Sequence, residues 1–298
     1  GLATANNGKY IAVRKSTKWA KNILESRPKK LLEVVKRYKT DLKITNEEEA
    51  KAYLATLSEI EIATLFDELK EKFGRDIFGQ GYIYRLIKDD EVADVETLTQ
   101  EEKDNGIDPS KKFYVPYDKG DKDGNRWFLE TPFAIAWNKE NVGFLKSNSG
   151  KKGEGMPVVR NPQYYFREGF CYSDINTTFL KCRIKECTVH STESMSFFSE
   201  TERVPDFYMV SIMNAKLIAY FVDSFINSTS HCTTGDAKLI PIIVPTEETL
   251  KAFEKLFNTA LKIKKETFSE TISLDESERQ LLEIQENLDT MVNDLYGI

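Results

Sequence analysis

The spacing of hydrophobic residues changes several times along the chain. Three stretches repeat apolar residues at helical intervals, residues 16–73, 206–225 and 274–296. Runs rich in aromatic and β-branched residues predict strands near 10–13, 78–86, 113–117, 133–137, 164–172, 178–184 and 195–198. We therefore predict an α+β fold, in which a mixed, twisted sheet carries a helical insertion at about 16–75. Residues 1–245 would form a recognition domain and residues 246–298 a helical C-terminal tail.

Residues that satisfy the free amides of a first helical turn mark where the helices begin. We expect Ser26 to cap a helix with Pro28 in its first turn, where a missing amide proton costs little. Further helix starts are expected at the pairs Thr45–Glu48 and Ser58–Glu61, and at Thr99, Asp206 and Thr246.

The composition is that of a globular protein. The 298 residues are 40% hydrophobic and 30% charged, enough for a sizeable core. No apolar run approaches the roughly 20 residues that span a bilayer, and no signal-peptide pattern opens the chain. We expect a cytoplasmic protein with no membrane partner. Because the first residues resemble the interior of a longer protein, we also expect a fragment or a single domain.

Charge alternates in blocks along the chain, although the net charge is only −6. Residues 1–43 hold 12 Lys+Arg against 3 Asp+Glu (net +9), and residues 109–185 hold 14 against 8 (net +6). Residues 44–108 hold 7 against 18 (net −11), and residues 186–298 hold 9 against 19 (net −10). Two basic blocks would suffice to attract a polyanion, whereas the acidic blocks favour a protein partner. For residues 18–43, a solvated helix face is the competing interpretation.

Residues 113–137 contain the most informative pattern. Two aromatic-rich runs flank the polar loop 118–126, whose two glycines and three cations predict a hairpin with a projecting basic tip. Residues 160–167 again combine cations, an amide and aromatic residues. Cations neutralise phosphate, amides pair with base edges and aromatic rings stack on bases, so both segments suggest nucleic-acid recognition. An ordinary hairpin with a solvated turn is the alternative.

Catalytic and metal-binding patterns are weak. The chain has no glycine-rich cofactor fingerprint and no Asn-Pro-Pro-Tyr tetrapeptide, so we expect no catalytic residue and no cofactor site. The acid-x-lysine pairs Glu49–Lys51 and Glu68–Lys70 are the only support for a nuclease, and both fall on predicted helices. The chain has four cysteines, Cys171, Cys182, Cys187 and Cys232, and it contains no Cys-x-x-Cys or His-x-x-x-His pair. We therefore expect no metal site and no disulfide framework.

Five short motifs in order carry a resemblance to a known family. They are Gly1-Leu2-Ala3-Thr4 with Asn6 and Tyr10; Pro116-Tyr117-Asp118-Lys119-Gly120 with Arg126-Trp127; Arg160-Asn161 with Tyr164-Tyr165-Phe166-Arg167-Glu168-Gly169; Ser194-Met195-Ser196-Phe197-Phe198; and Asn214-Ala215-Lys216 with Gly235-Asp236. This order resembles the TaqI-like C-terminal specificity domain of type IIG restriction-modification enzymes, to which BREX-type methyltransferases are related. The resemblance covers most of residues 1–15 and 76–298.

The resemblance implies a target-recognition module of an adenine-specific DNA methyltransferase, in which this chain is not itself catalytic. A methyltransferase domain that binds S-adenosylmethionine would precede Gly1 and be one partner, and double-stranded DNA would be the other. The residues expected to contact DNA are Lys9, Arg14, Lys119, Lys122, Asn125, Arg126, Trp127, Arg160, Asn161, Tyr164, Tyr165 and Arg167. Motifs shared by enzymes with different targets cannot all read bases, so most would grip the backbone. Base readout would fall to Lys122, Asn125 or residues 146–152. A BREX phage-defence specificity region without restriction activity and a helical protein-interaction module are the alternatives.

Overall fold

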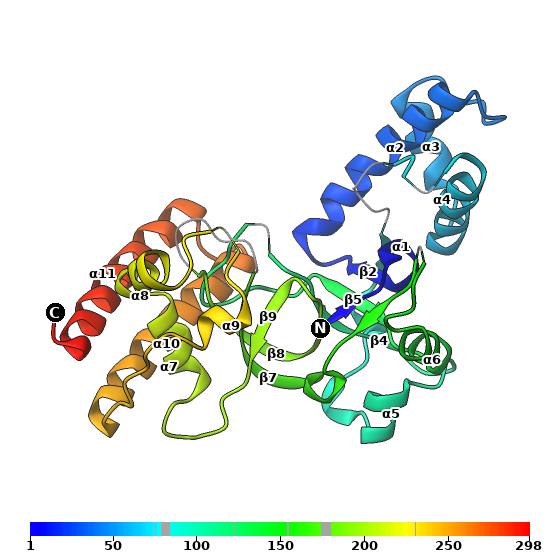
Figure 1. The fold of residues 1–298 in the computed structure, drawn as a ribbon. Helices are drawn as coiled ribbons and strands as arrows, with labels where there is room; N and C mark the ends of the chain where they lie inside the picture. The colour runs from blue at the N-terminus through cyan, green and yellow to red at the C-terminus, as the bar shows by residue number, and fades with distance from the viewer. Residues whose placement is uncertain (75, 79–83, 122, 154, 174–179, 230) are drawn as a thin grey trace. The chain divides into compact units, whose positions relative to one another are not determined.

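A computed structural model describes residues 1–74, 76–78, 84–121, 123–153, 155–173, 180–229 and 231–298. The chain forms two compact units (Figure 1), which we call the N-terminal unit (residues 2–117 and 132–162) and the C-terminal unit (Gly1 and residues 118–131 and 163–298). The fold class is α+β, as predicted. The division differs from the predicted boundary at residue 246, because residues 246–298 belong to the same unit as the strands that precede them.

The N-terminal unit contains a mixed sheet of strand order β3-β2-β5-β4. The central strand β2 (Ile11–Arg14) runs parallel to β3 (Arg85–Ile87) and antiparallel to β5 (Phe133–Ala136). On the far side of β5, β4 (Tyr114–Asp118) is antiparallel, with only its last residue in the C-terminal unit. The short strands β1 (Leu2–Ala3) and β6 (Val158–Val159) form a separate ladder. The other elements outside the insertion are α1 (Asn7–Tyr10), η1 (Asp89–Glu91), η2 (Val95–Thr97), α5 (Gln100–Asn105) and α6 (Lys139–Ser147).

The predicted insertion is present between β2 and β3 as the helices α2 (Lys18–Tyr38), α3 (Glu47–Ala55) and α4 (Glu59–Phe73). These helices share an apolar core that includes Leu31, Val34, Ala50, Ile62 and Phe66. Figure 1 shows the three helices packed together as one group. The insertion is therefore a folded helical bundle within the N-terminal unit.

Local capping chemistry located some helix starts correctly. Ser58 forms the predicted capping box with Glu61, and Thr99 and Thr246 cap α5 and α10 as expected. The prediction for Ser26 is wrong, because α2 already begins at Lys18 and Pro28 lies inside it. Burial of the apolar side of α2 offsets the cost of an internal proline. Two other predicted caps are shifted by one residue: Asn46 caps α3 in place of Thr45, and Pro205 precedes a helix that starts at Asp206.

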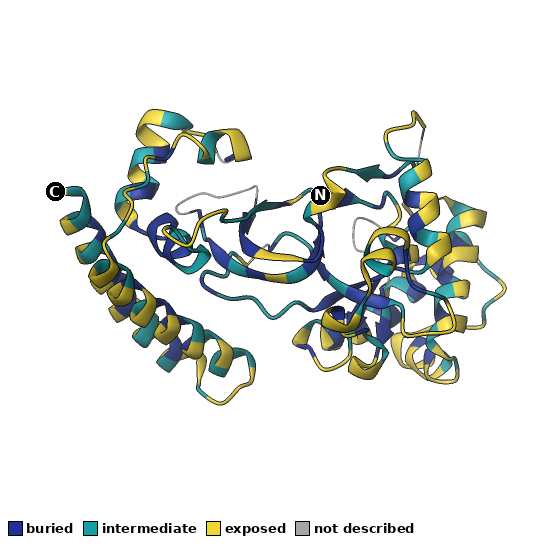
Figure 2. Ribbon diagram, turned by 90° about the horizontal axis from the view of Figure 1, so that it is seen from below, coloured by how far each residue is buried: buried dark blue, intermediate teal, exposed yellow. Residues whose placement is uncertain are grey.

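The C-terminal unit is built on the antiparallel strands β8 (Arg183–His190), β7 (Arg167–Ser173) and β9 (Ser194–Phe197), in that order. Its core joins side chains of these strands to Trp127 and to the helices that follow. The two longest helices of the unit, over residues 247–268 and 274–296, bury one side and expose the other (Figure 2). Its helices are α7 (Asp206–Met213), α8 (Lys216–Phe221), η4 (Val222–Ile226), α9 (Thr234–Ala237), α10 (Glu247–Phe268) and α11 (Leu274–Tyr296).

The helix predicted over residues 206–225 is broken, because Asn214 ends α7. The Asn214 side chain is fully buried, and its Oδ1 accepts from the Cys182 amide (2.8 Å) while its Nδ2 donates to the Cys182 carbonyl (2.9 Å). These bonds satisfy the backbone just before β8 and fix the bend. Among the described residues no single helix is long and apolar enough to cross a bilayer; α7 and residues 216–226 pass that test only as a pair bent by 65°.

Candidate nucleic-acid interface

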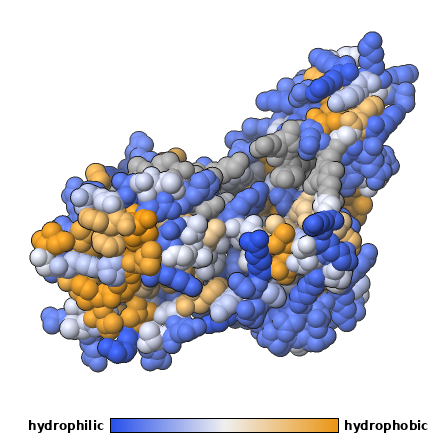
Figure 3. Space-filling model, viewed as in Figure 1, coloured by the Kyte–Doolittle hydropathy of each residue, from blue (hydrophilic) through white to orange (hydrophobic). Residues whose placement is uncertain are grey.

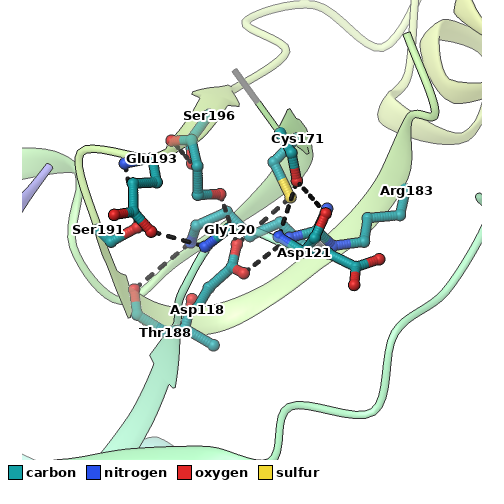
Figure 4. Close-up of polar contacts among 12 residues, drawn as sticks. Asp118, Gly120, Asp121, Cys171, Arg183, Thr188, Ser191, Glu193 and Ser196 are labelled. Atoms are coloured by element: carbon teal, nitrogen blue, oxygen red, sulfur yellow. Dashed lines mark hydrogen bonds and ion pairs between the residues drawn. The ribbon is translucent and has the colours of Figure 1, made fainter. Parts of the chain in front are cut away.

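A buried ion pair anchors the polar loop that the sequence placed at a hairpin tip. Asp118 is 6% exposed, and its Oδ1 accepts a hydrogen bond from Arg183 Nη2 at 2.8 Å (Figure 4). Its Oδ2 accepts from Ser194 Oγ (2.7 Å) and Cys171 Sγ (3.3 Å). Burial by itself would raise the pKa of Asp118, but Arg183 and the hydrogen bonds outweigh it and hold the pKa below its ordinary value. The start of the loop is thus fixed in the interior as a carboxylate.

The middle of the loop folds around a second carboxylate, Asp121, which is 8% exposed. Its side chain accepts hydrogen bonds from the amides of Asp123 (3.1 Å) and Asn125, and from Asn125 Nδ2 (2.9 Å). The Asp121 amide in turn donates to Ser173 Oγ at the end of β7 (2.7 Å). The loop is therefore held inward by its own acidic residues, whose spacing in the sequence indicates only a polar turn.

The cations and amides of this loop contact the C-terminal helices. Asn125 Oδ1 accepts from Lys264 Nζ on α10 (2.7 Å), and Arg126 donates to Gln285 Oε1 on α11. Trp127 is 2% exposed, adopts a positive φ of 72° and packs its ring edge-on against Phe257. Lys119 and Arg126, the described cations of this loop, do not form the predicted projecting basic tip, although β4 and β5 pair antiparallel as expected. Lys119 is half-buried, and Lys122 lies outside the described residues.

Residues around 164–167 form a group that we call the stacking cluster: Tyr164, Arg167 and Phe198. Arg167 is exposed, and the two aromatic residues are half-buried. Tyr164 ends η3 (Pro162–Tyr164), and its ring stacks on Phe198 with centroids 5.1 Å apart and planes 14° from parallel. The exposed Arg167 guanidinium lies 5.3 Å from the Tyr164 centroid and 5.1 Å from that of Phe198. Aromatic faces and a guanidinium are the groups on which nucleic-acid bases stack and to which phosphates bind.

Close backbone packing fixes the position of the stacking cluster. A Cβ at Gly169 would lie 2.2 Å from the Phe197 carbonyl oxygen, so only glycine lets β7 approach β9 this closely. A bulge between Arg167 and Gly169 interrupts the β7–β8 register at this point. The buried Lys185 ammonium donates to the Arg167 carbonyl (2.8 Å) and lies 5.4 Å from the Phe198 centroid. The cluster therefore stands on a rigid support.

Two carboxylates moderate the charge of the stacking cluster. Glu168 is exposed next to Arg167, and Asp206 at the start of α7 interacts electrostatically with both residues. Burial raises the pKa of Asp206, and Glu168 raises it further. One guanidinium among these neighbours is a weak electrostatic anchor for a polyanion, so the cluster is better suited to stacking on bases than to gripping a backbone.

Tyr165, another predicted contact residue, points into the interior. It is 6% exposed, and its ring meets His190 edge-on at 5.1 Å. Burial and the neighbouring Lys185 lower the pKa of His190 to about 3, so the imidazole is neutral at physiological pH. His190 Nδ1 is buried and has no hydrogen-bond partner among the described residues. Tyr165 and His190 therefore belong to the support of the stacking cluster and not to its surface.

The remaining predicted residues lie in the N-terminal unit. Lys9 is exposed in the last turn of α1, with its ammonium 5.7 Å from the Phe144 centroid. Arg14 is half-exposed and paired with Asp89, whose Oδ1 accepts from Arg14 Nε at 2.6 Å. Asp89 therefore offsets the charge of Arg14. Arg160 and Asn161 follow β6 and are exposed, with Asn161 at a φ of 51°.

The predicted residues are thus divided between two units. Residues 118–126 and 163–167 meet in the C-terminal unit through the buried residues Asp118 and Lys185, which interact electrostatically. Sequence reasoning missed the role of Phe198, although two consecutive aromatic residues at the end of a strand imply that one faces outward. No signal in the sequence distinguishes Lys185 from other lysines near predicted strands, so its role could not be predicted.

The two acid-x-lysine pairs lie on helices of the insertion, Glu49–Lys51 on α3 and Glu68–Lys70 on α4. Within the described ranges of the chain no group of three or more His, Cys, Asp or Glu side chains could hold a metal ion. Glu49, the acid of one acid-x-lysine pair, accepts hydrogen bonds from Thr45 at the start of α3, and Lys70 of the other pairs with Asp67. Both pairs therefore act in helix capping or on a helix surface.

Comparison with known proteins gives no family assignment. No protein-family model matches the chain, and no curated protein matches its sequence.

Proposed function

We propose that this chain is a double-stranded DNA recognition module that works with an adenine-specific methyltransferase domain in the cytoplasm. In this proposal the partner domain binds S-adenosylmethionine and transfers the methyl group, and the present chain selects the target without catalysing the reaction. The single observation that carries the proposal is the stacking cluster, a rigidly supported pair of aromatic rings with an exposed guanidinium over both. The order of motifs shared with TaqI-like specificity domains supports the choice of duplex DNA.

Burial and internal contacts reduce the number of predicted residues that we expect to contact DNA. Trp127 and Tyr165 are buried and Arg126 is bound to α11, so we assign these three to support of the fold. Tyr164, Arg167 and Phe198 remain as the base-contacting group of the C-terminal unit, and the exposed Lys9, Arg160 and Asn161 remain as contact residues of the N-terminal unit.

The test is binding of the purified chain to a random-sequence duplex library over a range of salt concentrations. A DNA reader should lose affinity steeply as salt rises, because bound phosphates release counterions. Tyr164→Ala should cost about 1–3 kcal/mol of binding free energy if the ring stacks on a base, whereas the control Tyr164→Phe keeps the ring and should bind as the parent does. Arg167→Gln should weaken binding, and Arg203→Gln, at another exposed arginine of the same unit, should not.

Two results would reject the proposal. One is affinity for duplex DNA that does not change with salt, or no measurable affinity. The other is equal binding by the Tyr164→Ala and Tyr164→Phe variants. Methyl transfer to DNA by the chain alone, followed with labelled S-adenosylmethionine, should show no turnover; turnover would place the catalytic groups in this chain.

A protein-interaction module is the second candidate function, and exposed apolar side chains favour it. Tyr220 and Phe225 are 64% and 71% exposed, and their rings lie 6.4 Å apart across α8 and η4. Leu239 is 65% exposed in the segment after α9. Figure 3 shows an apolar patch over this part of the C-terminal unit. Patches of this kind mark protein contacts, so Phe225→Glu should reduce self-association or partner binding while leaving DNA affinity unchanged.

A further inference from the structure

The outward face of α2 carries a row of cations. Lys18, Lys29 and Lys36 are eleven and seven residues apart, which is close to three and two helical turns, so they lie on one face. All three are exposed, and Lys21 is exposed beside them. We call Lys18, Lys21, Lys29 and Lys36 the basic row. It extends about 27 Å along the helix.

Acidic residues offset the charge of the basic row only in part. Glu25 lies four residues from both Lys21 and Lys29, and Glu33 lies four from Lys29 and three from Lys36, so both glutamates are neighbours of the row on the helix surface. Residues 18–43 contain nine Lys+Arg and three Asp+Glu, and apart from the buried Arg27 and the half-buried Lys30 the nine cations are exposed. Glu25 and Glu33 are the acidic residues of α2 itself. The carboxylates of the bundle are concentrated on α3 and α4, whose first turns alone hold Glu47, Glu48, Glu49, Glu59 and Glu61. The bundle therefore has one basic helix and two acidic ones.

A buried ion pair holds α2 in place on the N-terminal unit. Arg27, 2% exposed, donates to both carboxylate oxygens of Glu59 on α4 at 3.0 and 2.7 Å. Its Nη2 also donates to the Tyr84 carbonyl (2.7 Å), and Glu59 accepts from the Leu86 amide in β3 (2.9 Å). Because Arg27 joins α2 both to Glu59 on α4 and to the backbone at Tyr84, the basic row is pre-organised, and ordering it against a partner costs little entropy.

The stacking cluster does not account for binding to phosphate, so the phosphate contacts must be sought elsewhere in the chain. The net charge of each unit shows where cations are in excess. The C-terminal unit holds 16 Lys+Arg and 25 Asp+Glu, net −9, whereas the N-terminal unit holds 26 and 23, net +3. Duplex DNA presents about one negative charge per 1.7 Å of its axis, so a binding protein needs several cations along one surface. Within the N-terminal unit the basic row is such a surface, because it places four exposed lysines along one helix.

We propose that the basic row of α2 binds the phosphate backbone of duplex DNA. This inference rests on the proposed function and adds to it, because it assigns the helical insertion a sequence-independent role in affinity. The partner is the sugar-phosphate backbone, so the contact should not depend on the bases that the protein selects. Removing it should weaken binding to every duplex alike.

The experiment compares two triple variants of the full chain by salt titration on one duplex that the parent binds and on one random duplex. The test variant is Lys21→Gln, Lys29→Gln and Lys36→Gln. The control is Lys51→Gln, Lys72→Gln and Lys88→Gln, which removes the same charge from exposed positions next to carboxylates in the same unit. Circular dichroism melting of both variants confirms that the bundle is folded.

The test variant should lower the slope of log affinity against log salt by about 2–3, since each lost phosphate contact removes about 0.9. The control should change the slope by less than about one, and the ratio of affinities for the two duplexes should stay constant in both. If the parent binds DNA and the two variants behave alike, the basic row is a solvated face and this inference is wrong, while the proposed function stands. If the parent itself shows no salt-dependent DNA binding, both fail.

Discussion

Asp118→Asn tests how much the buried ion pair between Asp118 and Arg183 stabilises the C-terminal unit. The substitution keeps the shape of the side chain and removes its charge. The Arg183 guanidinium, 2% exposed, then loses its hydrogen-bonded counterion and keeps only the electrostatic interaction with Asp121. At the observed 2.8 Å and an effective dielectric constant near 20, the lost Coulomb attraction is about 6 kcal/mol. Because the neutral amide also costs less to bury, we expect a net loss of about 3–5 kcal/mol in the free energy of unfolding.

The assay is urea unfolding followed by tryptophan fluorescence in a background of Trp19→Phe and Trp137→Phe. This background leaves Trp127, in the core of the C-terminal unit, as the sole reporter among the three tryptophans. With a denaturant slope of about 2 kcal/mol per molar urea, the midpoint should fall by roughly 2 M. The matched control Asp123→Asn changes an exposed carboxylate of the same loop and should leave the midpoint almost unchanged.

Adding Arg183→Met to Asp118→Asn should restore part of the loss, since removing both charges leaves neither buried alone. A midpoint for Asp118→Asn close to that of the parent would refute the reasoning. A double variant no more stable than the single one would show that hydrogen bonds from Ser194 and Cys171, and not the charge pair, carry the stabilisation.

Two further predictions concern the support of the stacking cluster. The pKa of His190 is lowered to about 3 from 6.5, so the unfolded chain takes up a proton between these values and the folded chain does not; stability should fall by about 3 kcal/mol from pH 6.5 to pH 4. His190→Phe should flatten that dependence in urea unfolding at a series of pH values, and an unchanged slope would contradict the burial argument. Gly169→Ala should destabilise the C-terminal unit by about 1–3 kcal/mol and weaken DNA binding, because the new Cβ would meet the Phe197 carbonyl. Gly143→Ala on α6, where a Cβ meets nothing within 4 Å, should not destabilise the protein and so serves as the control.

Local sequence patterns predicted the elements whose stability is local. The capping box of Ser58 and Glu61, the cap at Thr246 and the span of the final helix follow from contacts within four residues. The strands β4 and β5 and the helical insertion follow from apolar periodicity in the same way. Where a longer-range force competed, local reasoning failed: Pro28 does not open a helix, because burial of the apolar side of α2 carries the helix past it.

The sequence by itself determined the α+β class, some of the helix starts, the basic and acidic blocks and the segments in which contact residues should be sought. Only the tertiary structure decided which of these residues reach the surface. Asp118 meets Arg183 across 65 positions and Arg126 meets Gln285 across 159, so the loop that reads as an exposed basic tip is drawn into the interior. Tyr164 meets Phe198 in the same non-local way, and the two half-buried rings form the stack beside the exposed Arg167. The physical reason is that pairing and burial of charged and aromatic groups depend on partners distant in the chain, which no local pattern specifies.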